Sequence, residues 1–363
     1  MSEERELKLN RLPAITWYWL KMNEASLEDF SPAGSAAVQK EIPEGVTEQE
    51  EAADLLGTQA TGAGKAFGEA VAASGIGTTV YTVPAGKSIP DTLRLKYKFA
   101  KDGDTLNRVD LIAEKNSELT VVMDYTSEEG AAGSACVQTK VDLKENAVLK
   151  LVQIVRVGDA FTIVNDLGGK VDDSARIELI QLVLDGGNVY QGYQIDLEGF
   201  KSSLKNNLAY RVSGSCHLDI NNFANHTGRK TESEIIVNGV LRDSASKILR
   251  ATIDLKKGAK GAVGNEAEDV LLMDEGVHNQ TIPLILCTEE DVVGNHGATI
   301  GRLDENLMFY MESRGMDKET IYEMMAKARI DATIRLIPDV RTRAEISEYV
   351  GGGNEDDEEG ETA

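Results

Sequence analysis

The residue best suited to chemistry is His296, which lies in the glycine-rich stretch 294–301. Glycine adopts backbone conformations that other residues avoid, so the three glycines of this stretch predict a tight path between the last strand and the first C-terminal helix. A junction of this kind exposes its imidazole to a partner or a metal ion. The sequence gives no such setting to His217 and His226, which we expect to be structural side chains.

The other reactive side chains belong to three cysteines: Cys136, Cys216 and Cys287. Their odd number and wide spacing predict free thiols in a reducing compartment rather than disulfides. Cys216 precedes His217 in a predicted strand, and because neighbouring side chains of a strand point to opposite faces, the two cannot pair as thiolate and imidazole. Cys287 and Glu290 are near His296 in the sequence, but spacing alone does not bring the three together.

Familiar catalytic motifs are missing from the sequence. Residues 57–66 are glycine-rich, but Ala66 stands where a phosphate-binding loop carries a hydroxyl for Mg²⁺. There is no Gly-x-Ser-x-Gly, His-Glu-x-x-His or Cys-x-x-Cys motif. A hydrolase, a zinc protease and a nucleotide-binding loop are therefore not supported.

The charge balance excludes a further class of function. The 363 residues include 38 Lys and Arg against 61 Asp and Glu, a formal charge of −23 at pH 7. Binding to a phosphate backbone needs clustered Lys and Arg, so we expect no nucleic-acid partner. No stretch has the roughly 18–20 apolar residues that span a bilayer, and the first residues lack the features of a signal peptide. We expect a soluble, cytoplasmic protein with no membrane partner.

The elements that must position these residues are mostly strands. From about residue 78 to 293, short runs rich in Val, Ile, Leu and Thr alternate with Gly, Asn and Asp. The last four runs are 17, 18 and 14 residues apart, measured between their central residues: Ile236, Ile253, Leu271 and Ile285. This spacing is long for hairpins and short for helical crossovers, but it suits the stacked coils of a β-solenoid. A β-sandwich remains the alternative, which the turn dipeptide Asn238-Gly239 mildly favours.

Two amphipathic helices are predicted beyond this region. Asp304 is the expected N-cap of the first helix, and Gly315 sits where a left-handed residue ends it. The second helix has apolar residues at i, i+3, i+4, i+7 and i+11 from Ile321, with Asp317 as its N-cap. Residues 351–363 contain six acids and almost nothing to bury, which is typical of a disordered tail.

The first 77 residues are mixed in character. Trp17, Trp19 and Leu20 form an apolar group that is expected to dock onto a larger body. The pattern over 47–56 predicts a capped helix, and 57–77 a loosely helical connector. We therefore expect four regions: an N-terminal helical and connector region (1–77), a β-helix core (78–295), a C-terminal helical region (296–350) and an acidic tail (351–363).

A more specific signal comes from residues 291–315. Residues 291–304 (Asp-Val-Val-Gly-Asn-His-Gly-Ala-Thr-Ile-Gly-Arg-Leu-Asp) and 307–315 (Leu-Met-Phe-Tyr-Met-Glu-Ser-Arg-Gly) resemble the C-terminal signature of the SufB/SufD family of iron–sulfur cluster assembly proteins. Residues 239–243, 251–255 and 268–274 are similar to the same family. The strong similarity covers roughly residues 165–335.

The resemblance implies a mainly β fold, a right-handed parallel β-helix flanked by helical N- and C-terminal regions. It also implies a non-catalytic scaffold, in which a SufB-type and a SufD-type chain join two copies of the ATPase SufC. A transient iron–sulfur cluster or iron would be held at the interface, with no permanently bound cofactor. His296 falls on a SufD position implicated as an iron ligand, and Cys287 on another family cysteine. The helical region implied to contact SufC contains five residues of interest: Leu307, Phe309, Tyr310, Arg314 and Gly315.

Two departures make the chain resemble SufD rather than SufB. SufB proteins carry an acceptor cysteine six residues before the proline that is Pro283 here, and this chain has Val277. SufB proteins also follow the histidine with glutamate, where this chain has Gly297. The missing thiolate and carboxylate are therefore expected from a second subunit.

Two alternatives remain. One is a minimal system in which a single SufB/SufD-like chain forms a homodimer with SufC, and Cys287 or Cys216 replaces the acceptor thiol. The other is a carbohydrate-active β-solenoid enzyme, which needs paired carboxylates on one face. Asp269 and Asp274 are candidates only in a trivial sense, and an aromatic content of 5% leaves little surface for stacking on sugars.

Overall fold

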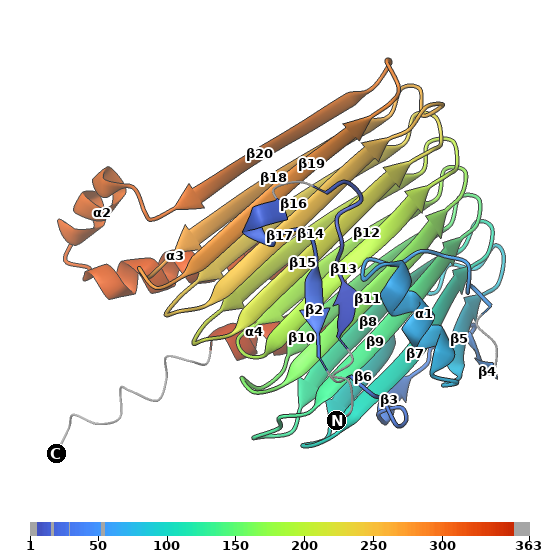
Figure 1. Cartoon of the computed structure of the whole chain (residues 1–363), viewed down its shortest axis with the longest axis horizontal. Helices are drawn as coiled ribbons and strands as arrows, with labels where there is room; N and C mark the ends of the chain where they lie inside the picture. Colours follow the sequence, from blue (N-terminus) through green and yellow to red (C-terminus); the bar gives the residue numbers. More distant parts are fainter. Residues whose placement is uncertain (1–5, 16–17, 29, 52–54, 352–363) are drawn as a thin grey trace.

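The computed structural model describes residues 6–15, 18–28, 30–51 and 55–351. Most of them form a parallel β-solenoid, in which the chain winds through two facing nine-stranded sheets (Figure 1). Along most of the stack, strands alternate between the sheets, so each strand pairs with the strands two before and two after it. Ladder partners are about 30 residues apart, which is one coil. The predicted solenoid is confirmed and the sandwich alternative is wrong, because the 14–18-residue spacing is half a coil.

Sheet I contains, in stacking order, β4 (Thr47–Glu51), β5 (Thr78–Val83), β7 (Asp104–Ala113), β9 (Ser134–Leu143), β11 (Thr162–Val171), β13 (Asn188–Leu197), β15 (His217–His226), β17 (Ser246–Leu255) and β19 (His278–Cys287). Sheet II contains β3 (Val38–Glu41), β6 (Leu93–Phe99), β8 (Glu118–Ser127), β10 (Val148–Arg156), β12 (Arg176–Leu184), β14 (Ser203–Val212), β16 (Glu232–Leu241), β18 (Val263–Leu272) and β20 (Val293–Gly301). Only β3 and β4, at one end of the stack, pair antiparallel with their neighbours within these two sheets as described.

Short turns between the strands repeat from coil to coil. Asn116, Asn146 and Ser174 occupy such turns with φ values of 56°, 58° and 56°. Asparagine tolerates this left-handed conformation better than most residues, because its short polar side chain bonds locally. The amide of Asn116 donates to the carbonyl of Glu145 on the next coil at 2.9 Å. The turns therefore stack by the same backbone bonding as the strands.

A row of buried amides interrupts the apolar core inside the solenoid. The Nε2 of Gln153 donates to Oδ1 of Asn165 at 3.0 Å, across the interior. The Nε2 of Gln181 donates to Gln153 at 2.9 Å, and the Nδ2 of Asn206 donates to Gln181 at 3.0 Å. Each of the last two bonds joins neighbouring coils of sheet II, so the amides help to fix the register in which the strands stack.

Three C-terminal helices follow the last strand: α2 (Glu305–Glu312), α3 (Lys318–Ile334) and α4 (Val340–Gly351). The predicted caps are confirmed, since the Asp304 and Asp317 carboxylates accept from backbone amides of the first turns, and Gly315 has φ 90°. The apolar faces of α3 and α4 cover the outer face of sheet II, where Ile330 and Ile346 join the same buried cluster as strand residues such as Val152. Within the described ranges, no helix is both long and apolar enough to cross a membrane.

Ion pairs also hold the C-terminal helices in place. Arg94 of β6 donates to both carboxylate oxygens of Asp339, at 3.1 and 2.5 Å. Although burial opposes ionisation, these bonds and those from Thr342 lower the pKa of Asp339 to about 2. The carboxylate therefore stays ionised and paired across the neutral pH range.

The N-terminal segment covers the outer face of sheet I through β1 (Leu7–Leu9), η1 (Tyr18–Leu20), β2 (Ala25–Leu27) and α1 (Lys65–Ala73). Leu9 and Phe67 are fully buried there, and Arg250 of β17 bonds the carbonyl of Met22 at 2.7 Å. The prediction that the N-terminal segment docks onto a larger body is thus confirmed. The residues chosen for it were wrong, because Trp19 and Leu20 are 76% and 53% exposed.

Other N-terminal predictions have mixed outcomes. Trp17 lies outside the described residues. The predicted helix over 47–56 is wrong where the structure describes it, because Thr47–Glu51 is the strand β4, which gains a backbone ladder with β5 that an isolated helix would lack. The connector contains one α-helix, α1.

His226 is a structural side chain, as expected. It is fully buried, and its ring nitrogens lie 2.8 Å from the hydroxyls of Thr231 and Ser233. Burial lowers its pKa to about 4. The folded protein therefore holds this imidazole neutral at pH values where an unfolded chain would protonate it.

We predict a pH-dependent contribution to stability from His226. Below pH 6.5 the imidazole of His226 is protonated in the unfolded state but stays neutral in the folded state. The free energy of unfolding therefore falls by up to about 1.4 kcal/mol for each pH unit as the pH is lowered to 4. Urea unfolding at pH 7, 5.5 and 4.5 should show a smaller acid loss for His226→Gln than for the wild type. The exposed His278→Gln serves as the control. Equal pH slopes in all three proteins would contradict the assignment.

Candidate functional site

His296 lies on β20, the last strand of the solenoid (Figure 1). The sequence predicted a turn here, and that prediction is wrong. Residues 293–301 form a strand because each pairs in parallel with β18, and Gly294, Gly297 and Gly301 are not among the residues with positive φ. The expected boundary between residues 295 and 296 falls inside this strand. Glycine serves here as a small residue of an exposed edge rather than as a turn former.

Among the described residues, β20 has a neighbouring strand on one side only. It pairs with β18, and every residue of the strand except Gly301 is exposed. β19 ends sheet I in the same way, and its residues are mostly half-buried or exposed. We call the surface formed by β19 and β20 the open end. An unpaired strand edge presents free backbone donors and acceptors, so it is a surface that takes a further strand.

The alternation of side chains places His296 over the interior of the solenoid. A Cβ added to Gly294 would lie 3.0 Å from Ile285 and 3.3 Å from Leu255, which identifies the inward face of β20. His296 is two residues further on and therefore shares that face. Its ladder partner on β18 is Glu266, which is 5% exposed.

A buried ion pair lies close by, two residues further along β18 and on the preceding strand β17. Lys247 pairs with Glu268, and Thr281 donates to the second carboxylate oxygen of Glu268 at 2.8 Å. Both members of the ion pair are almost completely buried. Burial lowers the pKa of Lys247, although the carboxylate of Glu268 opposes that shift. Sequence reasoning missed these residues, because they come from three separated strands and form no local motif.

Glu266 differs from Glu268 in having no such partners. Its Oε2 is buried and receives no hydrogen bond from any residue that the structure describes. Burial, with a smaller effect from Glu268, raises the pKa of Glu266 to about 8. A buried carboxyl without a hydrogen-bond donor is costly in its charged form, so this group is stabilised by a proton, a water molecule or a cation.

The cysteines are arranged unequally. Cys136 and Cys216 are buried, and burial raises the pKa of both thiols. Cys287 is the last residue of β19 and is exposed at the open end, with Sγ 3.1 Å from the carbonyl of Glu289. Alternation gives it the inward face, as its ladder partner Leu255 shows, but no further coil covers it. Within the described part of the chain, no three His, Cys, Asp or Glu side chains converge as a metal-binding group, so Cys287 and His296 are not brought together in one.

The five residues expected at a SufC contact lie on or just after α2. Phe309 is 74% exposed and Tyr310 52% exposed, whereas Leu307 is half-buried. The guanidinium of Arg314 stacks over the ring of Tyr310 at 4.9 Å, and Gly315 ends the helix. In Figure 1, α2 projects beyond the end of β20. The two aromatic side chains of the helix are therefore accessible to a partner.

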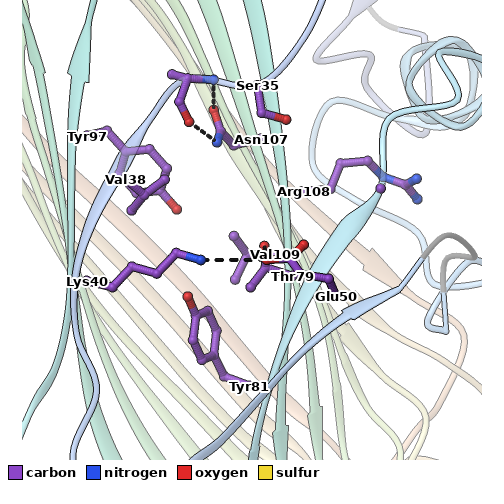
Figure 2. A pocket seen from close by; sticks show the side chains of 12 residues that line it. Ser35, Val38, Lys40, Glu50, Thr79, Tyr81, Tyr97, Asn107, Arg108 and Val109 are labelled. Carbon is purple, nitrogen blue, oxygen red and sulfur yellow. Dashed lines mark hydrogen bonds and ion pairs between the residues drawn. The ribbon is translucent and has the colours of Figure 1, made fainter.

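A polar cavity of about 240 Å³ lies at the opposite end of the stack, between β3, β4, β5 and β7 (Figure 2). Its charged groups bond to other parts of the protein, and Arg108 donates to the carbonyl of Ile76 at 2.9 Å. Lys40 lies 2.6 Å from Glu48 and 3.6 Å from Glu50, which also accepts a bond from Thr79. The side chain of Asn107 is bonded to the backbone of Ala36. These contacts satisfy the groups without a ligand, so we assign no site there.

Comparison with known proteins gives the geometry its context. A family model described as SUF system FeS cluster assembly, SufBD core domain, matches residues 98–329. The chain belongs to this family. The match runs from β6 into α3 and includes Glu266, His296 and α2.

Individual SufBD relatives are more distant. The iron-sulfur cluster assembly protein SufD of Bacillus subtilis is 24% identical over 241 residues, which are 66% of this chain and 55% of that protein. SufBD family proteins of Mycobacterium tuberculosis and Staphylococcus saprophyticus are 28% and 26% identical over 113 residues, 31% of this chain. Those residues are 13% and 24% of the two relatives. The chain therefore spans little more than half, or less, of these relatives, and the resemblance found in the sequence is confirmed at the level of the family.

The thiols offer a direct check of the site. We predict that a thiol reagent such as DTNB modifies about one thiol per folded chain and three after denaturation, because only Cys287 is exposed. Cys287→Ser should remove the fast reaction, while Cys216→Ser should leave it unchanged. Rapid modification of two or three thiols in the folded protein would show that the buried positions are wrong.

Proposed function

We propose that this SufBD family protein is a non-catalytic scaffold subunit for iron–sulfur cluster assembly. In this role it pairs through its open end with a SufB-type chain and binds the ATPase SufC through α2. A transient cluster or iron is held where His296 meets the partner. The observation that carries the proposal is the exposure of His296 on the unpaired edge of β20, within the region that matches the SufBD core.

The open end has the chemistry of a docking surface. Its outer strand offers free backbone groups along the whole length of β20, and its apolar side chains include Val293 and Ile300, which are 49% and 41% exposed. A second chain that adds a strand here would satisfy the backbone and cover both side chains. Such a contact would also place the partner's side chains beside His296.

His296 suits the role of a ligand to iron, because neutral imidazole is a donor for borderline metals. Soft thiolate ligands must come largely from elsewhere. Val277 stands where SufB carries its acceptor cysteine, and Cys136 and Cys216 are buried. A cysteine-bearing partner therefore complements what this chain lacks.

The surface of α2 supports the proposed contact with SufC. Phe309 and Tyr310 are large apolar side chains on a short helix that packs mainly against α3. Exposed aromatic residues of this kind are typical centres of protein–protein interfaces. The buried face of α3 packs against sheet II, and α2 packs against α3. A displacement of α2 by SufC would therefore be transmitted to the solenoid.

The homodimeric alternative keeps one supporting observation. Cys287 is exposed at the open end, on the same coil as His296. Two copies joined through this surface would bring two thiols and two imidazoles to one interface. Native mass spectrometry of the complex purified anaerobically from its own host distinguishes the two assemblies by the presence or absence of a SufB-type chain.

For His296→Ala, we predict that the complex still assembles but holds at least about tenfold less iron and acid-labile sulfide, since a first ligand is lost. The measurement is the iron and sulfide content per complex after anaerobic purification. His278→Ala, an exposed histidine on β19, is the matched control. Unchanged iron and sulfide contents in the His296→Ala complex would contradict the assignment of His296 as a ligand to iron.

For α2, we predict that the double variant Phe309→Ser, Tyr310→Ser no longer co-purifies with SufC but keeps the wild-type unfolding midpoint. Both side chains are more than half exposed, so their loss should change stability by less than about 0.5 kcal/mol. Val340→Ser, which is 66% exposed on α4, is the control. Retained SufC binding would mean that the interface lies elsewhere.

A further inference from the structure

Glu266 is the observation that the proposed function leaves unexplained. It is 5% exposed, inward-facing on the strand next to the open end, and its Oε2 has no hydrogen-bond donor among the described residues. Buried polar groups are nearly always paired, so an orphaned carboxylate oxygen needs a reason. The missing partner is either a proton, a water molecule or a cation.

The nearby ammonium is already committed to another carboxylate, and the buried hydroxyl of Tyr193, which interacts electrostatically with Glu266, makes no hydrogen bond within the described residues. The ammonium of Lys247 bonds Glu268, Thr281 and the carbonyl of Gln280. Thr281 in turn donates to Glu268. If both glutamates are ionised, one lysine faces two carboxylates, and the cluster carries one uncompensated negative charge. A bound cation would balance that charge and satisfy the orphaned oxygen.

The residue that pairs with Glu266 on the next strand toward the open end is His296. The two residues are ladder partners, and partners on neighbouring parallel strands are about 4.8 Å apart. The adjoining rung shows that side chains of this ladder reach one another, since Asn295 Nδ2 donates to Asn265 Oδ1 at 2.9 Å. The imidazole and the carboxyl therefore share a face and a rung, one exposed and one buried.

We propose that Glu266 and His296 together bind a divalent transition-metal ion at the open end, with the carboxylate as the inner donor and the imidazole as the outer one. The inference rests on the proposed function, because it takes His296 as a ligand, and it adds Glu266 as a second ligand from the same chain. A carboxylate and an imidazole suit ferrous iron and its neighbours in the first transition series.

Two donors make a half-site rather than a closed cage. The remaining positions of the ion face the open end, where water or a partner's side chains complete them. This agrees with the absence of a third His, Cys, Asp or Glu donor at any one point of the described structure. It also gives the buried charges a use: Lys247 neutralises Glu268 and leaves Glu266 for the ion.

The test uses the full chain alone, without SufC or any partner, and Co²⁺ alone as a spectroscopic stand-in for ferrous iron. Anaerobic titration should give one Co²⁺ per wild-type chain, followed by its visible absorption and by calorimetry. Glu266→Gln keeps the shape of the side chain and removes its charge, and we expect at least tenfold weaker binding. His296→Ala should weaken binding to a similar degree, and in a double-mutant cycle the two effects should not add.

Two matched controls keep the assignment specific. Glu290→Gln removes an exposed carboxylate beyond the end of β19, and His278→Ala removes an exposed imidazole from the same strand; neither should change Co²⁺ affinity. Glu266→Met provides a second, apolar variant in case the glutamine is poorly accommodated. Unfolding midpoints check that each variant is folded.

Failure of this inference is separate from failure of the proposed function. Equal Co²⁺ affinity of wild type and Glu266→Gln, or no Co²⁺ binding by the wild type, would overturn the half-site. If His296→Ala nevertheless lowers the iron and sulfide of the complex, the scaffold function stands and Glu266 is only a buried acid. If that variant also leaves iron and sulfide unchanged, the ligand role of His296 falls as well.

Discussion

The parallel backbone ladder between coils is the interaction on which the rest of the structure depends. Every strand inside the stack pairs with the coil before it and the coil after it, and the amides of Gln153 and Gln181 repeat the arrangement in the interior. A stack of this kind has two ends. At one end β3 and β4 pair as antiparallel strands, while at the other no strand in the described part of the chain continues the sheet beyond β20. The open end is therefore a consequence of the fold itself.

The same stacking geometry determines the surroundings of the charged side chains that are buried in the last coils. In the middle of the stack, the amides of Gln153 and Gln181 bond to neighbouring coils. Near the open end, Lys247 and Glu268 bond each other, whereas Glu266 has an orphaned oxygen among the described residues. Such an arrangement opposes stability. Its position under the exposed His296 is what connects it to the proposed function.

Much of the fold was predictable because its signal is local and repeated. The spacing of Ile236, Ile253 and Leu271 is half a coil, because each half-coil consists of one strand and one turn. The capping residues Asp304 and Asp317 mark the residues at which two helices begin. The strand β20 was missed because glycines and exposed polar residues imitate a loop, and only its pairing with β18 makes it a strand. The prediction of a helix over 47–56 was wrong for a related reason. The sequence has a helical pattern, but residues 47–51 pair with β5 as a strand, and this long-range pairing cannot be read from the local pattern.

The candidate site was less accessible to sequence reasoning than the fold. His296 was found through its setting and through a family resemblance. Glu266, Lys247 and Glu268 were not found, because nothing in the sequence says which residues share a rung, and a shift of one residue in register would turn their side chains to the other face.

The measurement that tests the central claim most directly is amide hydrogen exchange along β19 and β20, in the chain alone and in its complex with a SufB-type partner. In the free chain, we predict fast exchange for the outward amides of β20 and slow exchange for those of β14, which has neighbours on both sides. In the complex, the new protection should be concentrated in β19 and β20. Protection that appears instead at β3 and β4, with β20 unchanged, would show that the open end is not where the partner docks.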